Sequence, residues 1–353
     1  MALANKRFTR LYIGKEATPG TPVAFTRRLT GEGNADFNTN QTQFQWDDSW
    51  GAGVRTQRVQ TPLNIGRGTV CTFRAPFDFD NVLLALLSGF HGGITPTEPD
   101  PVAAPGNRLW DFNLVPRDRA GQETYTFLYG ETDDTSRTVF RSDYMFCREF
   151  TITASSQQIA QMDMTFEGRA AAEYTPSVPN LEVHTNRAVG SWGFGINISG
   201  SWADMIAEDG QSDTASNVDN IRYTMSGQWQ PIFTLSDIGQ ESFSAAQLDT
   251  ASAQISFDVL IDPVTGSTAR GEYRASTLGQ RRFVEFKGFR GSGADQREVH
   301  LFGCFVHDPD SMTQRGPDRD GIPTLRASMT SVYDPTSAND VRAQVRNRLP
   351  SYP

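Results

Sequence analysis

The sequence predicts a mainly β protein made of two tandem β-sandwich or β-barrel domains, each with a short flanking α-helix. Apolar and polar residues alternate with period two in many segments, most clearly from Ala160 to Glu167, as in strands with one buried face. Loops rich in Pro and Gly, such as His91–Asn107, separate these segments. The chain of 353 residues is also long for one domain, since ~150 residues per domain is usual.

The first half contains the clearest helix signal. The stretch Asp80–Gly89 is apolar nearly all round, which predicts a short buried helix with Asp80 as N-cap and Gly89 after the C-cap. The polar, aromatic region Asn34–Gly66 is expected to be a strand pair with a long loop. Further strands are expected at Gly68–Asp78, Trp110–Val115, Tyr125–Tyr129, Phe146–Ile152 and Ala160–Glu167.

The second half repeats this order of elements. Its expected strands are Trp192–Ser199, Ile221–Trp229, Ile255–Ile261, Phe283–Phe289, Val299–Val306 and Leu325–Tyr333, with a helix-compatible stretch at Ala269–Leu278. We match Gly68–Gly89 with Ala253–Gly279, and Phe146–Glu167 with Leu301–Tyr333. Residue identity is low, so this is a repeat of pattern, and chance similarity of two β-rich halves is the alternative.

The expected boundaries are an N-terminal arm at 1–25, a first β domain at 26–180, a second at 181–336 and a C-terminal segment at 337–353. Two prolines and two glycines in the arm, Leu11–Phe25, argue against helix or central strand there. In the C-terminal segment, Val341, Val345 and Leu349 share one face of a helix if that segment is helical.

Charge and composition exclude several classes. A net charge of −9 argues against a protein that grips nucleic acid, because such binding needs a basic face. No window approaches ~18 consecutive apolar residues, so no membrane span is expected, and the start of the chain does not resemble a secretory signal. Three widely spaced cysteines, Cys71, Cys147 and Cys304, indicate reduced thiols in a cytosolic setting.

No enzyme chemistry, cofactor or metal is expected. His300 and Cys304 share a strand face and His307 stands beside Asp308, but a zinc site usually needs four convergent ligands. Asp318–Gly321 lacks the remaining ligands of a calcium loop and predicts a turn. Phosphate-binding and nucleophile-elbow motifs are missing. A pair of catalytic carboxylates from distant strands, as in glycosidases, stays an open alternative, but nothing in the sequence identifies such a pair.

Three stretches of the chain resemble phage tail tube proteins. The opening Gly14-Lys15-Glu16-Ala17-Thr18-Pro19-Gly20-Thr21-Pro22 is similar to the start of that family, which often has G-x-E followed by a G-T-P/A turn. Thr72–Gly89 looks like the family's aromatic strand running into a short apolar helix. Ser328–Asp334 is similar to its final strand, which tends to end in tyrosine or aspartate.

The resemblance implies a tail-tube-like β-sandwich or barrel that assembles into stacked rings around a channel for DNA. Single-domain members form rings of six and members with two copies per chain form rings of three, so a trimeric ring is expected, with a hexamer as the alternative. It also implies a virion protein of a long-tailed phage, assembled in the host cytoplasm. The implied partners are other copies of itself, a tape-measure protein, and tail terminator or baseplate proteins, while DNA passes through the lumen without specific binding.

Contacts between subunits and rings are expected from the arm, from the long loops Trp46–Gly66 and Trp229–Leu248, and from the C-terminal segment. The candidate interface residues are Lys15, Glu16, Thr18, Pro19, Trp46, Trp50, Arg55, Arg58, Trp229, Phe233, Phe243, Val341, Val345 and Leu349.

Two other readings compete. A head-decoration, connector or baseplate protein would share the structural role. A β-sandwich protein that binds or hydrolyses carbohydrate could use its six tryptophans as stacking platforms, although such residues are more often core and interface anchors.

Overall fold

The structure is a computed structural model. It describes residues 7–8, 11–29, 31–39, 42–44, 63–65, 68–99, 101–102, 105–113, 123–129, 139–155, 158–174, 193–199, 218–232, 245–261, 272–273, 275–291, 296–316, 318, 321–336 and 341–352.

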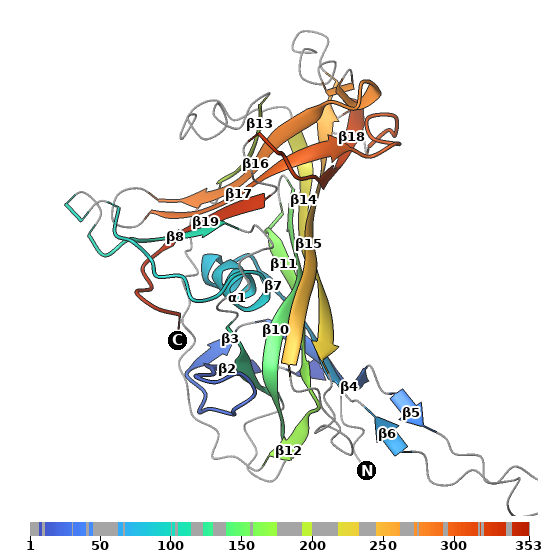
Figure 1. Ribbon diagram of the computed structural model, residues 1–353. Helices are drawn as coiled ribbons and strands as arrows, with labels where there is room; N and C mark the ends of the chain where they lie inside the picture. The colour runs from blue at the N-terminus through green and yellow to red at the C-terminus, as the bar shows by residue number, and fades with distance from the viewer. Residues whose placement is uncertain are drawn as a thin grey trace, which may run out of the picture.

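The protein is mainly β, as the sequence predicts, and its strands form one large antiparallel sheet of 17 strands and a separate pair. The first half of the chain supplies β1 (Arg7–Phe8), β2 (Leu11–Lys15), β3 (Arg27–Leu29), β4 (Glu32–Thr39), β7 (Gly68–Pro76), β8 (Arg108–Asn113), β9 (Tyr125–Tyr129), β10 (Val139–Ala154), β11 (Gln161–Arg169) and β12 (Ala172–Tyr174). The separate pair is β5 (Thr42–Phe44) and β6 (Leu63–Ile65), which Figure 1 shows apart from the body of the molecule.

The second half supplies β13 (Gly193–Ser199), β14 (Val218–Ile232), β15 (Ala245–Leu260), β16 (Arg281–Arg290), β17 (Arg297–His307), β18 (Thr324–Ser331) and β19 (Val341–Asn347). The strands expected from the period-two patterns are confirmed, most with shifts of a few residues at their ends. Two begin much earlier than expected: β10 at Val139 and not at Phe146, and β15 at Ala245 and not at Ile255. Residues 272–273 and 275–277 are helical, within the stretch expected to allow a helix.

The predicted helix is confirmed as α1 (Phe79–Gly89), and every one of its residues is buried. Its N-cap is not Asp80, as the sequence suggested, but Asp78, whose side chain accepts a hydrogen bond from the Asp80 backbone N–H. Gly89 lies inside the helix and not beyond it. A Cβ at Gly89 would collide with the carbonyl oxygen of Cys147 on β10, so glycine allows the helix to pack closely on that strand.

Six strand pairings of the first half recur in the second half in the same chain order. The first half pairs β4 with β7, β7 with β11, β11 with β10, β10 with β9, β9 with β2, and β10 with β12. The second half pairs β14 with β15, β15 with β18, β18 with β17, β17 with β16, β16 with β13, and β17 with β19. Helical residues 272–273 and 275–277 follow β15 as α1 follows β7.

Among the described strands, two pairings join the halves. The second part of β10 pairs with β14 from Glu149↔Ser226 to Ala154↔Ile221, so the two halves share one continuous sheet. β19 pairs with β8 from Arg342↔Asn113 to Asn347↔Arg108. Figure 1 shows α1 in the corner between these two sets of strands, and α1 contacts β10 on one side and β17 and β19 on the other.

Three expectations about local structure are corrected. Leu11–Lys15 is a strand in spite of the glycine and prolines near it, because they fall at its end and in the following turn, and β2 pairs with both β3 and β9. Val341–Asn347 is a strand and not a helix. Trp229 and Leu248 are not in a loop but face each other as a pair in the hairpin of β14 and β15.

Candidate assembly surfaces

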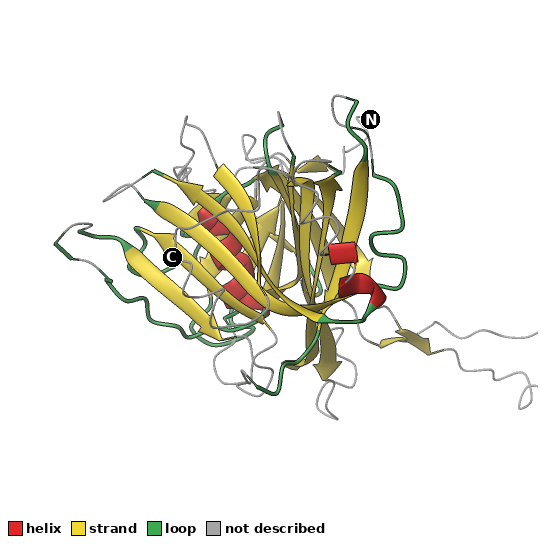
Figure 2. Ribbon diagram, turned by 90° about the horizontal axis from the view of Figure 1, so that it is seen from above, coloured by secondary structure: helices red, strands yellow, loops and turns green. Residues whose placement is uncertain are grey.

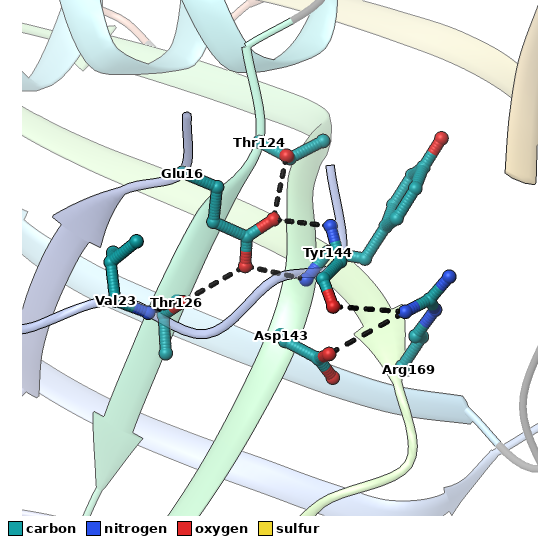
Figure 3. A network of polar contacts seen from close by, with 8 residues as sticks. Glu16, Val23, Thr124, Thr126, Asp143, Tyr144 and Arg169 are labelled. Atoms are coloured by element: carbon teal, nitrogen blue, oxygen red, sulfur yellow. Dashed lines mark hydrogen bonds and ion pairs between the residues drawn. The ribbon is translucent and has the colours of Figure 1, made fainter. Parts of the chain in front are cut away.

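The turn after β2 is fixed to the body of the protein by one buried carboxylate, Glu16. Its Oε2 accepts hydrogen bonds from Thr124 Oγ1 and from the Gly20 backbone N–H, both at 2.7 Å. Its Oε1 accepts from Thr126 Oγ1 at 2.9 Å and from the Tyr144 backbone N–H at 3.0 Å. Figure 3 shows Thr124, Thr126 and Tyr144, from the start of β9 and from β10, converging on the carboxylate.

The turn itself has the residues its geometry requires. Thr21 N–H donates to Thr18 C=O at 3.0 Å, and Gly20 has φ of 77°, a left-handed conformation that glycine adopts without strain. Arg169 Nη1 donates to Gly20 C=O at 3.1 Å and lies 3.5 Å from Asp143 (Figure 3). Burial raises the pKa of Asp143 above its ordinary value, against the opposing charge of Arg169.

The predicted arm residues therefore divide into two groups. Glu16 is buried, and Lys15 Nζ lies 2.7 Å from Glu123 Oε1, so both hold the N-terminal segment to its own chain. Thr18 and Pro19 are exposed at the tip of the turn, where another chain can reach them.

The predicted C-terminal residues lie in the interior of this chain. Val341 and Val345 are buried on the same face of β19, together with Ala343, while Arg342 and Arg346 alternate with them. Leu349 is partly buried against the same core. The spacing of four residues between Val341, Val345 and Leu349 fits a helix. The alternation of apolar residues and arginines across 341–346 fits a strand equally well. The strand forms because β8 and β17 pair with it on its two sides.

Trp229 is the one predicted aromatic contact whose side chain is described. It is partly buried on β14 and packs on Phe146 of β10, with ring centroids 4.6 Å apart. Trp229 thus contributes to the packing contact between the two halves. The other predicted contact residues, Trp46, Trp50, Arg55, Arg58, Phe233 and Phe243, lie outside the described residues.

A buried polar cluster, which the sequence did not predict, connects β3, α1 and the C-terminal segment. Arg27 Nη2 lies 3.4 Å from Asp80 Oδ2, and both side chains are buried. Asn347 Nδ2 donates to Asp80 Oδ1 at 3.1 Å, and Trp110 Nε1 donates to Asn347 Oδ1 at 3.1 Å. The ring of Tyr352 covers the Arg27 guanidinium at 5.0 Å.

The two histidines considered as metal ligands have other partners. His307 lies between Ser311 Oγ at 2.7 Å and Glu272 Oε2 at 3.1 Å, which resembles a Ser-His-Glu arrangement. Ser311 is buried, and its Oγ also accepts a hydrogen bond from the Ser328 backbone N–H, so it is not presented to a substrate. Within the described part of the chain, no group of three or more His, Cys, Asp or Glu could hold a metal ion.

His300 forms a buried charge cluster with two glutamates. Its Nδ1 lies 2.5 Å from Glu285 Oε1, and its Nε2 lies 3.5 Å from Glu298 Oε2. Burial alone would lower the pKa of His300, but hydrogen bonds to Glu285 and Glu298 and their charges outweigh it and raise the pKa to about 9. Burial also opposes ionisation of Glu298, but His300, Gln296 and Arg346 lower its pKa to about 2.

We expect this cluster to make stability fall at alkaline pH. Because the folded pKa of His300 lies above its ordinary value of 6.5, its contribution is complete below about pH 6.5 and is lost as the pH rises through about 9. At ~1.36 kcal/mol per pKa unit, this contribution amounts to about 3 kcal/mol. Urea unfolding from about pH 6 to pH 10 should show a decline of that size in the wild type and a clearly smaller one in His300→Gln. Equal declines in both proteins would contradict this assignment.

The chain matches no model of a known protein family, and no curated protein sequence is significantly similar to it. In the described part, no helix has the length and apolar character needed to cross a membrane. The three cysteines are buried thiols, and burial raises the pKa of Cys71 to about 12.

Proposed function

We propose that this protein is the tail tube protein of a long-tailed phage, of the type with two tube domains in one chain. In this proposal the strands of the first half form one β domain and those of the second half form a second, duplicated domain. Three chains form a ring of six domains, and stacked rings form the hollow tube through which DNA is ejected.

The repeated set of six strand pairings is the observation that carries the proposal. Matched pairs in the same chain order are expected when one domain has been duplicated, and a chance repeat of all six is a weaker explanation. The repeat also includes β2 and β19. In this proposal β2 therefore belongs to the first domain and not to a separate arm, and β19 belongs to the second domain and not to a separate C-terminal segment.

The contact between the halves supports a ring. β10 of the first half pairs with β14 of the second, and β14 corresponds to β4, so the contact joins two different surfaces of the repeated unit. Such head-to-tail contacts generate a ring when the rotation between units closes, and a filament when it does not. Two units per chain and six units per turn give three chains per ring.

Two further features support a tube. The pair β5–β6 projects from the body, a position suited to contact with the next ring (Figure 1). β6 lies within the predicted loop Trp46–Gly66, whose last residues therefore form a strand. The net charge of −9 suits a channel wall that repels the DNA backbone, so that DNA slides without sticking. The proposal includes a tape-measure protein and the tail terminator or baseplate proteins as partners, assembly in the host cytoplasm, and a final location in the virion.

The carbohydrate alternative has little support among the described tryptophans. Trp110 is buried and donates its Nε1–H to Asn347, and Trp229 is partly buried and packs on Phe146, so neither ring is fully open to a sugar. A head-decoration, connector or baseplate protein would make fewer stacked copies, and particle shape separates these roles from that of a tube.

Negative-stain electron microscopy and light scattering after size exclusion test the proposal on purified protein. We expect hollow tubes, or rings of three chains of 39.0 kDa each. Rings of six chains would contradict the duplicated-domain reading. A protein that stays monomeric up to the highest soluble concentration would contradict the tube function itself.

A further inference from the structure

One edge of β4 is covered by the short strand β1. β4 pairs with β7 on its other side, from Glu32↔Arg74 to Thr39↔Gly68. On the edge that faces away from β7, the two residues of β1 pair with Asn34 and Gly33. Among the described strands, no other one pairs with this edge, so residues 35–39 of β4 have room for a further strand.

The second half shows what kind of strand lies on such an edge. β14, the counterpart of β4, pairs with β15 on one side and with the end of β10 on the other. Figure 2 shows the strands enclosing α1, and the pairing of β10 with β14 is where the sheet passes from one half to the other. This contact between two repeat units occurs once within the chain, and a ring needs it again between chains.

Matching hydrogen bonds fix how the two halves correspond residue by residue. Just after β7, the Phe77 N–H donates to Ala160 C=O, and just after β15, the Ile261 N–H donates to Pro323 C=O. Counted from these bonds, the residues of β7 match those of β15, and the residues of β4 match their counterparts on β14 through the strand pairings.

In this match β1 lies on β4 where the end of β10 lies on β14. Asn34 corresponds to Arg222, because the two residues oppose matching positions of β7 and β15. The partner of Arg222 on its other side is Thr153 of β10, and the partner of Asn34 is Arg7 of β1. Both pairings are antiparallel. β1 therefore occupies the place that a neighbouring repeat unit takes on β14.

The second half has an open counterpart of the end of β10 at residues 314–316. This segment runs along β18 as the end of β10 runs along β11: the Gly316 N–H donates to Thr324 C=O, and the Arg326 N–H donates to Gln314 C=O. Between these bonds Arg315 forms an isolated bridge with β18, so its own N–H and C=O point away from that strand. Arg315 is exposed, and no described strand pairs with it on that side.

We propose that residues 314–316 of one copy of this chain dock as a strand on the edge of β4 of a second copy, and that β1 covers this edge until the copies meet. In the register of β10 on β14, Gln314 lies opposite Asp36 and Arg315 lies opposite Ala35. Residue 316 then takes the place of Arg7, so β1 leaves β4 when the strands pair. A covered edge does not pair with wrong partners before assembly. This inference rests on the proposed ring and names the strands that join one chain to the next.

A disulfide that locks β1 onto β4 tests the cover. Arg7 and Asn34 are paired, and opposing residues of antiparallel strands have Cα atoms ~4.5–5.5 Å apart, a distance that a disulfide spans. We expect the oxidised variant Arg7→Cys with Asn34→Cys to assemble at least about tenfold more slowly than the wild type in light scattering, because the lock removes the state that can dock. A reducing agent should restore the wild-type rate. The two single variants, oxidised in the same way, are the matched controls and should assemble as the wild type does.

Removal of residues 1–8 tests the cover in the opposite direction. The shortened chain has an uncovered β4 edge and should assemble faster than the wild type, with an unchanged circular dichroism spectrum. Slower assembly would show that β1 supports the contact and would overturn its role as a cover.

A cross-link between chains tests the register of docking. In the assembled protein, Gln314→Cys with Asp36→Cys should join one chain to the next and give dimers and larger species on a non-reducing gel. Val102→Cys with Asp36→Cys is the matched control, because Val102 is exposed but lies outside the proposed contact, and it should give monomers on the same gel. Assemblies without the link between positions 314 and 36, or a locked variant that assembles at the wild-type rate, would overturn this docking site and leave the ring proposal standing. A wild-type protein that forms no assembly would overturn both.

Discussion

Replacing Asp80 by alanine should destabilise the protein by about 3–5 kcal/mol, because it leaves the charge of Arg27 buried and without its carboxylate partner. Asp80 and Arg27 are both almost fully buried, 3.4 Å apart. In the described part of the chain, Nε and Nη1 of Arg27 have no hydrogen-bond partner, so Asp80 and the ring of Tyr352 are its main support. Urea unfolding followed by tryptophan fluorescence measures the change.

The exposed pair Arg315–Asp318 provides the matched control for Asp80. Its hydrogen bonds are shorter, at 2.8 to 3.2 Å, but both side chains are exposed to solvent. Exposed ion pairs contribute ~0–1 kcal/mol, so Asp318→Ala should change the free energy of unfolding by less than about 1 kcal/mol. Similar effects of the two variants would show that burial of the Arg27–Asp80 pair does not matter for stability.

Glu16→Ala should cost about 3–5 kcal/mol as well, because each buried donor left without its acceptor costs ~1–3 kcal/mol and several lose it together. The carboxylate accepts four hydrogen bonds, and its removal leaves the hydroxyls of Thr124 and Thr126 and the N–H groups of Gly20 and Tyr144 without this acceptor. Glu16→Gln should cost less, since its amide keeps one accepting oxygen. Chemical denaturation of both variants measures the order of these effects.

Thr18→Ala is the control for Glu16, because Thr18 lies in the same turn and is exposed. We expect it to change stability by no more than about 0.5 kcal/mol. If Glu16→Ala were as stable as Thr18→Ala, the carboxylate would not be what holds the turn to β9 and β10.

The regular elements were predictable because their signals are local. The alternation around Met162 and Met164 predicted β11, and the apolar run Val82–Leu87 predicted α1. The N-cap was misplaced because Asp78 and Asp80 are both suitable capping residues. In the structure Asp78 caps the helix, while the side chain of Asp80 contacts Arg27.

The polar clusters could not be predicted in the same way. Glu16 receives hydrogen bonds from Thr124 and Thr126, more than one hundred residues further along the chain, and no spacing in the sequence links them. The one available hint was an acidic residue beside a Pro-Gly turn. The error at β19 has a similar origin, since its pairing with β8 and β17 decides between two periodicities that the sequence satisfies equally.

The cover over α1 has a consequence for the order of events during synthesis. Translation proceeds at ~5–20 residues per second, so residues 341–352 emerge roughly ten to fifty seconds after the strands that surround α1 on its first side. Until β17 and β19 are in place, one side of a mainly apolar helix has no partner. The first half therefore cannot complete its fold on the ribosome by itself. A fragment that ends at the predicted boundary of 180 should expose this helix and aggregate, although it contains every residue of the first repeat.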